Sequence, residues 1–332
     1  MTKMRTRDRA PWRHHAAGAC RPGTGRSDGA GVTEPGLVIV DKPAGMTSHD
    51  VVAKLRRLAG TKRVGHAGTL DPMATGVLVI GLEKATRLLG HLTLTEKEYA
   101  ATIRLGAATV TDDAEGEILP PAGPVTARAS ELGESALAPA LTALTGTISQ
   151  VPPKISAIKV NGARAYHLTR SGAAPELAAR IVTIRRLDLL AVRRDGDMLD
   201  IDVEVTCSSG TYIRAIARDL GEMLGTGGHL TALRRIRVGP YDIGQARTLE
   251  QLAKSLECVP LAQAAAEAFP SVSLAAKEAW LASHGVRLDA AGGIPAGSFP
   301  PGPVAAFGPE GDLIALLAGA DGEIRPLAVF VA

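Results

Sequence analysis

The sequence predicts an α+β protein whose strands pair mainly as antiparallel hairpins and whose C-terminus carries a small β-rich module. Hairpin-like pairs of alternating strands outnumber strand–helix–strand units, the clearest pair being residues 181–192 and 199–205 around Asp195-Gly196. Apolar residues spaced three and four apart mark helices between some of the strands. Composition also changes near residue 268, because all 4 phenylalanines lie beyond it and all 4 tyrosines before it.

The 332 residues divide into three parts by composition. Residues 1–34 mix arginine with glycine, proline, serine and histidine without apolar periodicity, which predicts a disordered basic tail. Residues 35–266 carry the strand and helix patterns of the predicted main domain, and residues 267–332 are expected to form the β-rich module. An alternative for the tail is that translation begins at Val32, because the folded pattern starts at Gly36.

Length and composition exclude several classes of protein. No apolar run reaches the roughly 18 residues that a membrane span needs. The cysteines Cys20, Cys207 and Cys258 are too widely spaced for a disulfide framework or a metal knuckle. There is no phosphate-binding Walker loop and no helical histidine pair for zinc. We therefore expect a cytoplasmic protein without a metal, whose nearly balanced net charge of +3 hides local positive clusters.

The elements follow from local patterns. Thr47 or Ser48 is expected to cap a helix that Gly60 ends. The acidic stretch 109–116 has the composition of a solvated loop. Further strands and helices are expected at residues 37–40, 77–82, 98–106, 137–144 and 248–256, and three short C-terminal strands at 304–307, 313–317 and 327–331.

Residues 63–76 combine three glycines, a proline, a histidine and a single carboxylate, Asp71. Pro72 biases Asp71 towards an extended conformation, and the glycines allow a ligand to approach the backbone. Asp-Pro is also typical of a helix N-terminus, but only three residues separate Pro72 from Gly76, which is too few for a stable helix. A positioned nucleophile or base on a stiffened loop is therefore the favoured interpretation of Asp71.

Cations cluster in two other regions. Tyr166 follows three cations, Lys154, Lys159 and Arg164, in a mixture typical of RNA-binding surfaces. A glycine-bounded segment carries Arg234 and Arg235, which suits contact with phosphates. The alternative for such runs is a solvated surface, and for each tyrosine a place in the core.

Arg214 lies in the first turn of a predicted helix, where a cation is unfavourable for the helix dipole. This position hints that Arg214 pairs with a carboxylate, although an ordinary surface arginine is the alternative. His66 could likewise be an ordinary loop histidine.

Five stretches of the chain resemble the bacterial tRNA pseudouridine synthase B (TruB) family. They are residues 65–76 (Gly-His-Ala-Gly-Thr-Leu-Asp-Pro-Met-Ala-Thr-Gly), 40–52, 152–166, 207–214 and 227–241. The resemblance implies a pseudouridine synthase fold with a mixed, mainly antiparallel sheet flanked by helices, and a C-terminal PUA-like RNA-binding module. It also implies isomerisation of uridine 55 in the T stem-loop of tRNA, without a cofactor and with base flipping.

The resemblance carries roles onto the residues that match. Asp71 matches the nucleophile, Tyr99 the tyrosine that packs on the target base, and Arg214 the arginine paired with the aspartate. His66 matches the histidine that fills the gap left by the extruded base, and Arg87 falls at a basic position near the site. The RNA-binding set expected in this way comprises His66, Arg63, Arg87, Lys154, Lys159, Tyr166, Tyr212, Arg234 and Arg235.

Some alternatives stay open from the sequence. Asp71 could attack either C1′ of the ribose or C6 of the uracil. A non-catalytic RNA-binding protein on the same scaffold, and a nucleosidase that cleaves rather than isomerises, are the rival functions. We expect a monomer whose partner is tRNA and which has no membrane or cofactor partner.

Overall fold

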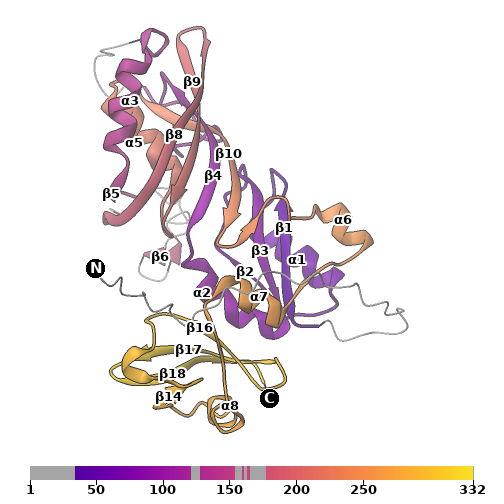
Figure 1. Cartoon of the computed structure of the whole chain (residues 1–332). Coiled ribbons are helices and arrows are strands. Elements are labelled where there is room, and N and C mark those ends of the chain that lie inside the picture. The colour runs from indigo at the N-terminus through magenta and orange to yellow at the C-terminus, as the bar shows by residue number, and fades with distance from the viewer. Residues whose placement is uncertain (1–33, 121–127, 154–158, 161–162, 165–176, 332) are drawn as a thin grey trace, which may run out of the picture.

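The structure is a computed structural model that describes residues 34–120, 128–153, 159–160, 163–164 and 177–331 (Figure 1). Its main body is a ten-stranded mixed sheet, and a separate four-stranded sheet lies at the C-terminal end. The basic tail, Lys154 and Tyr166 lie outside the described residues, and only the backbone of Lys159 is described.

The main sheet is antiparallel except where the third strand meets the tenth. Arg234 on β10 pairs in parallel with Thr75 on β3, and every other pairing in this sheet is antiparallel, which confirms the predicted fold class. The path runs β12 (Val259–Pro260), β1 (Gly36–Lys42), β3 (Thr75–Leu82), β10 (Gly228–Val238), β4 (Lys97–Leu105), β9 (Met198–Cys207), β8 (Arg180–Asp195) and β5 (Gly146–Gln150), with β2 (Val64–Ala67) on β3 and β11 (Tyr241–Asp242) on β10.

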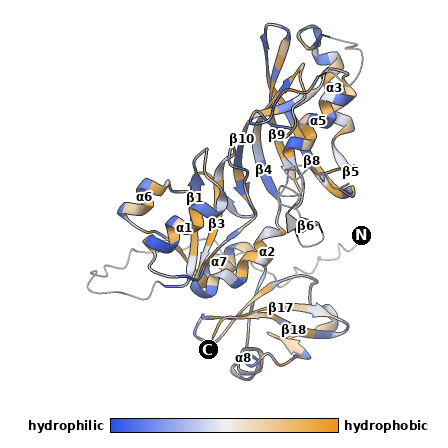
Figure 2. Cartoon of the chain, turned by 180° about the vertical axis from the view of Figure 1, so that it is seen from behind, coloured by the Kyte–Doolittle hydropathy of each residue, from blue (hydrophilic) through white to orange (hydrophobic). Residues whose placement is uncertain are grey.

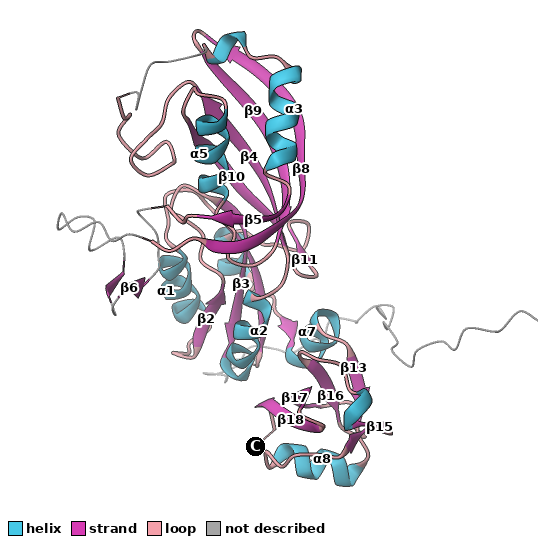
Figure 3. Ribbon diagram, turned by 90° about the vertical axis from the view of Figure 1, so that its left-hand side faces the viewer, coloured by secondary structure: helices cyan, strands magenta, loops and turns pink. Residues whose placement is uncertain are grey.

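Helices cover the sheet and supply its core contacts. Thr47 caps the helix α1 (Ser48–Leu58), as predicted. Its side chain accepts from the amide of Asp50, and the two residues form a capping box. The helix α5 (Ile213–Met223) buries one face against β10 and β4, and Figure 3 shows it beside α3 (Glu134–Ala143). In the described part of the chain the remaining helices are α2 (Leu89–Thr93), α6 (Leu249–Lys254), α7 (Leu261–Ala268) and α8 (Ala276–Ser283), with 3-10 turns at Glu83–Leu88, Ala129–Glu131 and Ala296–Ser298.

The C-terminal module shares part of its core with the main domain. Its sheet has the order β13 (Ser271–Ser273), β16 (Val304–Phe307), β17 (Leu313–Ala320), β18 (Glu323–Val329), and Figure 2 shows the hydrophobic character of β17. Leu316 and Phe330 pack in one cluster with Val79 and Leu88 of the main domain, whereas Leu317 belongs to the module's own core. Folding of the module is thus coupled to the main sheet.

Short pairs of strands complete the described structure, namely β6 (Lys159–Val160) with β7 (Ala163–Arg164), and β14 (Ala290–Ala291) with β15 (Ile294–Pro295). The sequence analysis did not anticipate α8, which joins the β-rich module's core through Ala279 and Ala282. No helix among the described residues is long and apolar enough to cross a membrane.

Candidate active site

A pocket of about 310 Å³ opens beside the loop that carries Asp71. Its walls come from residues 68–71, from the start of β4, from the turn 209–214 that leads into α5, and from β10. Asp71, Tyr99 and Arg214, which lie far apart in the sequence, all line it. Tyr212, expected to bind RNA, lines the same wall as Arg214.

Asp71 and Arg214 form an ion pair at this pocket. Arg214 Nη2 donates to Asp71 Oδ1 at 3.0 Å, and Arg214 Nε lies 2.9 Å from Asp71 Oδ2, although its N–H is not aligned for a hydrogen bond. The Arg214 side chain is 6% exposed and that of Asp71 is 34% exposed. The arginine is therefore fixed in the protein, while the carboxylate faces the open pocket. Asp71 lies in a loop rather than at a helix start, as predicted.

The acidic stretch 109–116 is not the solvated loop that its composition predicts. The side chain of Asp113 is only 5% exposed, and its Oδ2 accepts from Arg214 Nη1 at 3.2 Å. Its Oδ1 accepts from the hydroxyl of Thr111 at 2.5 Å and from the amide of Glu115 at 3.1 Å. Arg214 thus bridges two carboxylates, and Asp113 is a site residue that the sequence analysis missed. A buried carboxylate requires such partners. The only local feature of the sequence that could have indicated this role for Asp113 was the run of three acids in one short turn.

The Asp71 loop is held in place by side chains from three separate elements. The hydroxyl of Ser48 accepts from the amide of Leu70 at 2.9 Å and donates to its carbonyl at 3.2 Å. Lys42 Nζ donates to the carbonyls of Pro43 at 2.9 Å, Met46 at 2.6 Å and Pro72 at 3.2 Å. Burial lowers the pKa of the Lys42 ammonium to about 8, against the opposing attraction of Asp71. The sequence analysis singled out neither Ser48 nor Lys42 for this role.

Arg235 is the third support of the loop, and its predicted role as a phosphate contact does not fit its position. Its side chain is almost completely enclosed, at 1% exposed for the residue. Its Nη2 donates to the carbonyl of Gly68 at 3.1 Å and its Nε to that of Val77 at 2.7 Å. At Gly76 (φ +99°) a Cβ would lie 2.2 Å from the carbonyl oxygen of Arg235, so only glycine permits this close approach of β3 to β10.

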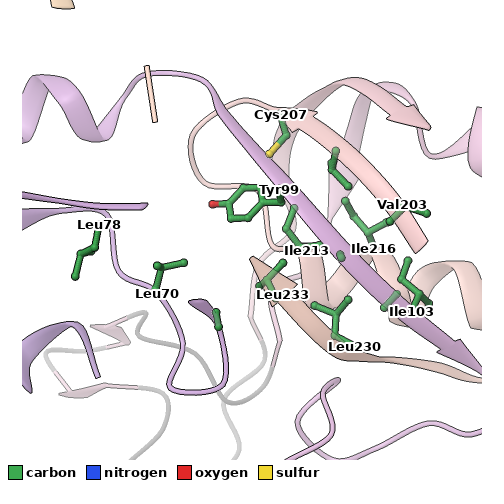
Figure 4. Packing of buried hydrophobic residues seen from close by; sticks show 14 of the residues in the cluster. Leu70, Leu78, Tyr99, Ile103, Val203, Cys207, Ile213, Ile216, Leu230 and Leu233 are labelled. Atoms are coloured by element: carbon green, nitrogen blue, oxygen red, sulfur yellow. The ribbon is translucent and has the colours of Figure 1, made fainter. Parts of the chain in front are cut away.

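Tyr99 forms the apolar side of the pocket. Figure 4 shows its ring beside Cys207 and Ile213, with the hydroxyl directed away from both. Burial raises the pKa of the Tyr99 phenol, so the hydroxyl is protonated at neutral pH. Lys97, two residues earlier on β4, donates through Nζ to the carbonyls of Thr93 at 2.8 Å and Thr95 at 2.7 Å. Burial also lowers the pKa of the Lys97 ammonium, to about 8.

Among the described residues, the other members of the expected RNA-binding set lie outside the pocket lining. His66 on β2 packs edge-on against His49, with ring centroids 5.5 Å apart, and burial lowers its pKa. Arg63 is exposed and lies 3.6 Å from Glu83. Arg87 donates to the carbonyl of Val329, so it joins the main domain to the C-terminal module.

Arg234 has a different environment from its neighbour Arg235. Its side chain is 40% exposed. Its Nη2 donates to Asp41 Oδ2 at 2.7 Å and its Nη1 donates to Asp41 Oδ1 at 3.1 Å. A phosphate can therefore bind Arg234 only by competing with the Asp41 carboxylate for the guanidinium.

The chain matches the descriptions of known protein families along most of its length. The family description "TruB family pseudouridylate synthase (N terminal domain)" matches residues 56–213, and those of the tRNA pseudouridylate synthase B C-terminal domain and of "tRNA Pseudouridine synthase II, C terminal" match residues 214–266 and 269–331. The tRNA pseudouridine synthase B of Arthrobacter sp. (strain FB24) is 59% identical over 89% of this chain and 96% of its own length. That of Thermobifida fusca (strain YX) is 56% identical over 89% of this chain and 98% of its own.

A chain in the crystal structure of a Cbf5-Nop10-Gar1 complex has a similar fold. It superimposes with a TM-score of 0.67 at 26% identity, covering 91% of this chain and 85% of that chain. The fold and the matched family descriptions are those of a pseudouridine synthase, an isomerase that modifies RNA. The chain belongs to the TruB family of pseudouridylate synthases.

Proposed function

We propose that this enzyme isomerises uridine 55 in the T stem-loop of tRNA, with Asp71 as the nucleophile. The observation that carries the proposal is the Asp71–Arg214 pair in an open pocket beside Tyr99. Relatives that are 56% and 59% identical over nearly their whole length are named tRNA pseudouridine synthase B, which supports tRNA as the substrate.

The reaction breaks the bond between N1 of uracil and C1′ of ribose and forms a bond from C5 to C1′. C5 loses a proton and N1 gains one, so the product is an isomer of the substrate. Asp71 attacks the substrate at C1′ or C6, and the transient bond splits one difficult step into two. Arg214 holds the attacking carboxylate in one orientation through the contacts at 2.9 and 3.0 Å. The Tyr99 ring offers a face on which the base can stack. Because the Tyr99 hydroxyl is protonated, it can accept the C5 proton only if it donates its own proton to another group.

The uridine must leave its stack to enter the pocket, at a cost of a few kcal/mol. We propose that His66 fills the space it leaves and that Arg63, Arg234 and the segment around Lys154, Lys159 and Tyr166 hold the RNA backbone. We further propose a PUA-like RNA-binding role for residues 267–332. From the family resemblance we also propose that the enzyme acts as a monomer, in the cytoplasm where its tRNA substrate is found.

The test is incubation of the purified protein with an unmodified tRNA transcript, followed by carbodiimide mapping of pseudouridine. A single stop at position 55, lost in Asp71→Asn, is the expected result. Tight binding without modification would favour a non-catalytic RNA-binding protein, and release of free uracil would favour a nucleosidase. Modification at another site would keep the chemistry and overturn the substrate.

A further inference from the structure

Two arginines on α5 hold two consecutive aspartates of the turn 109–116. Arg214 and Arg218 are four residues apart, so they lie side by side on the helix surface. Arg214 binds Asp113, as described above, and Arg218 Nη1 donates to Asp112 Oδ2 at 3.2 Å. The second pair touches neither Asp71 nor the pocket lining, so the proposed chemistry gives it no role.

Arg218 is itself held firmly. Its Nε and Nη2 donate to Asp219 Oδ1 at 2.9 and 2.7 Å, and its Nη2 also donates to the carbonyl of Val151 at 2.8 Å. The side chains of Arg218 and Asp112 are 20% and 14% exposed, so water screens their attraction only in part. The guanidinium is thus a fixed anchor on α5, rather than a mobile surface group.

Asp112 adopts a strained backbone conformation. Its φ of +59° lies in the left-handed region, which residues other than glycine adopt less readily. Three contacts hold it there: its amide donates to the carbonyl of Thr109 at 3.3 Å, its carbonyl accepts from the amide of Leu230 on β10 at 3.1 Å, and its side chain binds Arg218. Because Asp113 is the next residue, the conformation of Asp112 sets the direction in which the Asp113 carboxylate leaves the backbone.

We propose that Asp112 and Arg218 are positioning residues for the reaction, whose ion pair fixes the turn 109–116 so that Asp113 holds Arg214 in register with Asp71. This inference rests on the proposed function. The chain of contacts runs from Arg218 through Asp112 and Asp113 to Arg214 and ends at the carboxylate of Asp71. A small rotation of the turn would move Arg214 Nη1, and with it the plane of the guanidinium that orients the nucleophile.

The proposal predicts a pH dependence. Burial raises the pKa of Asp112 to about 6, against the attraction of Arg218 and Arg214 on α5 and together with the repulsion of Asp219 on α5 and of Asp113 beside it. As the pH falls through about 6, Asp112 becomes neutral and its ion pair with Arg218 weakens. The rate of the chemical step should then fall on the acid side.

The experiment compares wild type with Asp112→Asn, Arg218→Met and the double variant, and uses Glu117→Gln as a control that removes an exposed charge from the same region. Single-turnover rate constants and tRNA affinities are measured between pH 5 and 8, after pseudouridine formation by wild type has been established. An inactive wild type would contradict the proposed function itself. The role of Asp112 and Arg218 is tested by the differences between the rate constants of the variants and that of active wild type.

We expect each single variant to slow the chemical step about 10- to 100-fold, the loss typical of a misplaced reacting group, with tRNA affinity unchanged. The acid-side inflection should disappear in Asp112→Asn, and the double variant should be no slower than the slower single one. Asn tolerates the left-handed conformation, so Asp112→Asn should fold. Unchanged rates with the inflection retained, or losses that add fully in the double variant, would overturn the proposal.

Discussion

Arg214 is the only residue that contacts both oxygen atoms of the Asp71 carboxylate among the described contacts, with Nε 2.9 Å from Oδ2 and Nη2 3.0 Å from Oδ1. The arginine is buried, whereas the aspartate faces the pocket. A fixed cation behind a half-exposed carboxylate orients the carboxylate without closing off its approach to substrate. The predictions below test this arrangement and the elements that support it.

Asp71→Asn should abolish turnover and leave tRNA binding largely intact, because the amide keeps the shape of the carboxylate but is a poor nucleophile. Turnover is measured by tritium release from C5-labelled tRNA, and binding by filter retention. Activity above a few per cent of wild type would contradict the assignment of Asp71 as the nucleophile.

Asp113→Ala should destabilise the fold by about 3–5 kcal/mol, because it leaves Arg214 with one carboxylate partner fewer in a buried site. Asp113→Asn should fold better and show a lower kcat with little change in KM, since the amide still accepts a hydrogen bond from Arg214 without supplying charge. Chemical denaturation and steady-state kinetics check the two effects. Equal stability of Asp113→Ala and wild type would show that the buried pair is dispensable.

Arg234 and Arg235 are neighbours on one strand and should behave differently. Arg234→Ala should weaken tRNA binding and reduce the slope of log Kd against log salt concentration by about 1, because a partly exposed arginine can release a counterion from a phosphate. Arg235→Ala should leave that slope unchanged and lower stability and kcat, because its guanidinium binds the Asp71 loop. An unchanged slope for Arg234→Ala would remove it from the RNA-binding set.

Lys42 should make stability depend on pH. Its pKa in the folded protein is about 8, below the ordinary lysine value of 10.5. Between these values the unfolded chain binds more protons, so this group's contribution to the free energy of unfolding rises with pH. From pH 7.5 to 9.5 wild type should gain on the order of 2 kcal/mol relative to Lys42→Met. The exposed Lys54→Met is the matched control, and a difference that does not vary with pH would contradict this account.

Leu316 and Leu317 are adjacent, fully buried residues that face different cores. Replacing either by alanine should cost about 2–5 kcal/mol. In hydrogen exchange, Leu316→Ala should also reduce the protection of β3, because its cluster includes Val79, whereas Leu317→Ala should affect only the C-terminal sheet. The same exchange pattern in both variants would show that the two cores are not distinct.

Local sequence patterns determined much of this protein. The capping of α1 by Thr47, the hairpin of β8 and β9 and the apolar face of α5 all follow from interactions between residues close in the chain. Asp71 could be singled out because glycine and proline restrict the backbone around it. The misfit of Arg214 with its helix dipole also pointed to a carboxylate partner, and the family resemblance implied Asp71; the structure adds Asp113 as a second partner.

Only the tertiary structure decided which charges are buried and what they bind. Asp113 looked like a solvent-facing acid and Arg235 like a phosphate contact, because a local pattern carries no information about burial. Arg214 meets Asp71 across 143 positions of sequence and Arg235 meets Gly68 across 167. Contacts between residues so far apart depend on the packing of α5 and β10 against the sheet, so the chain as a whole sets the geometry of the site.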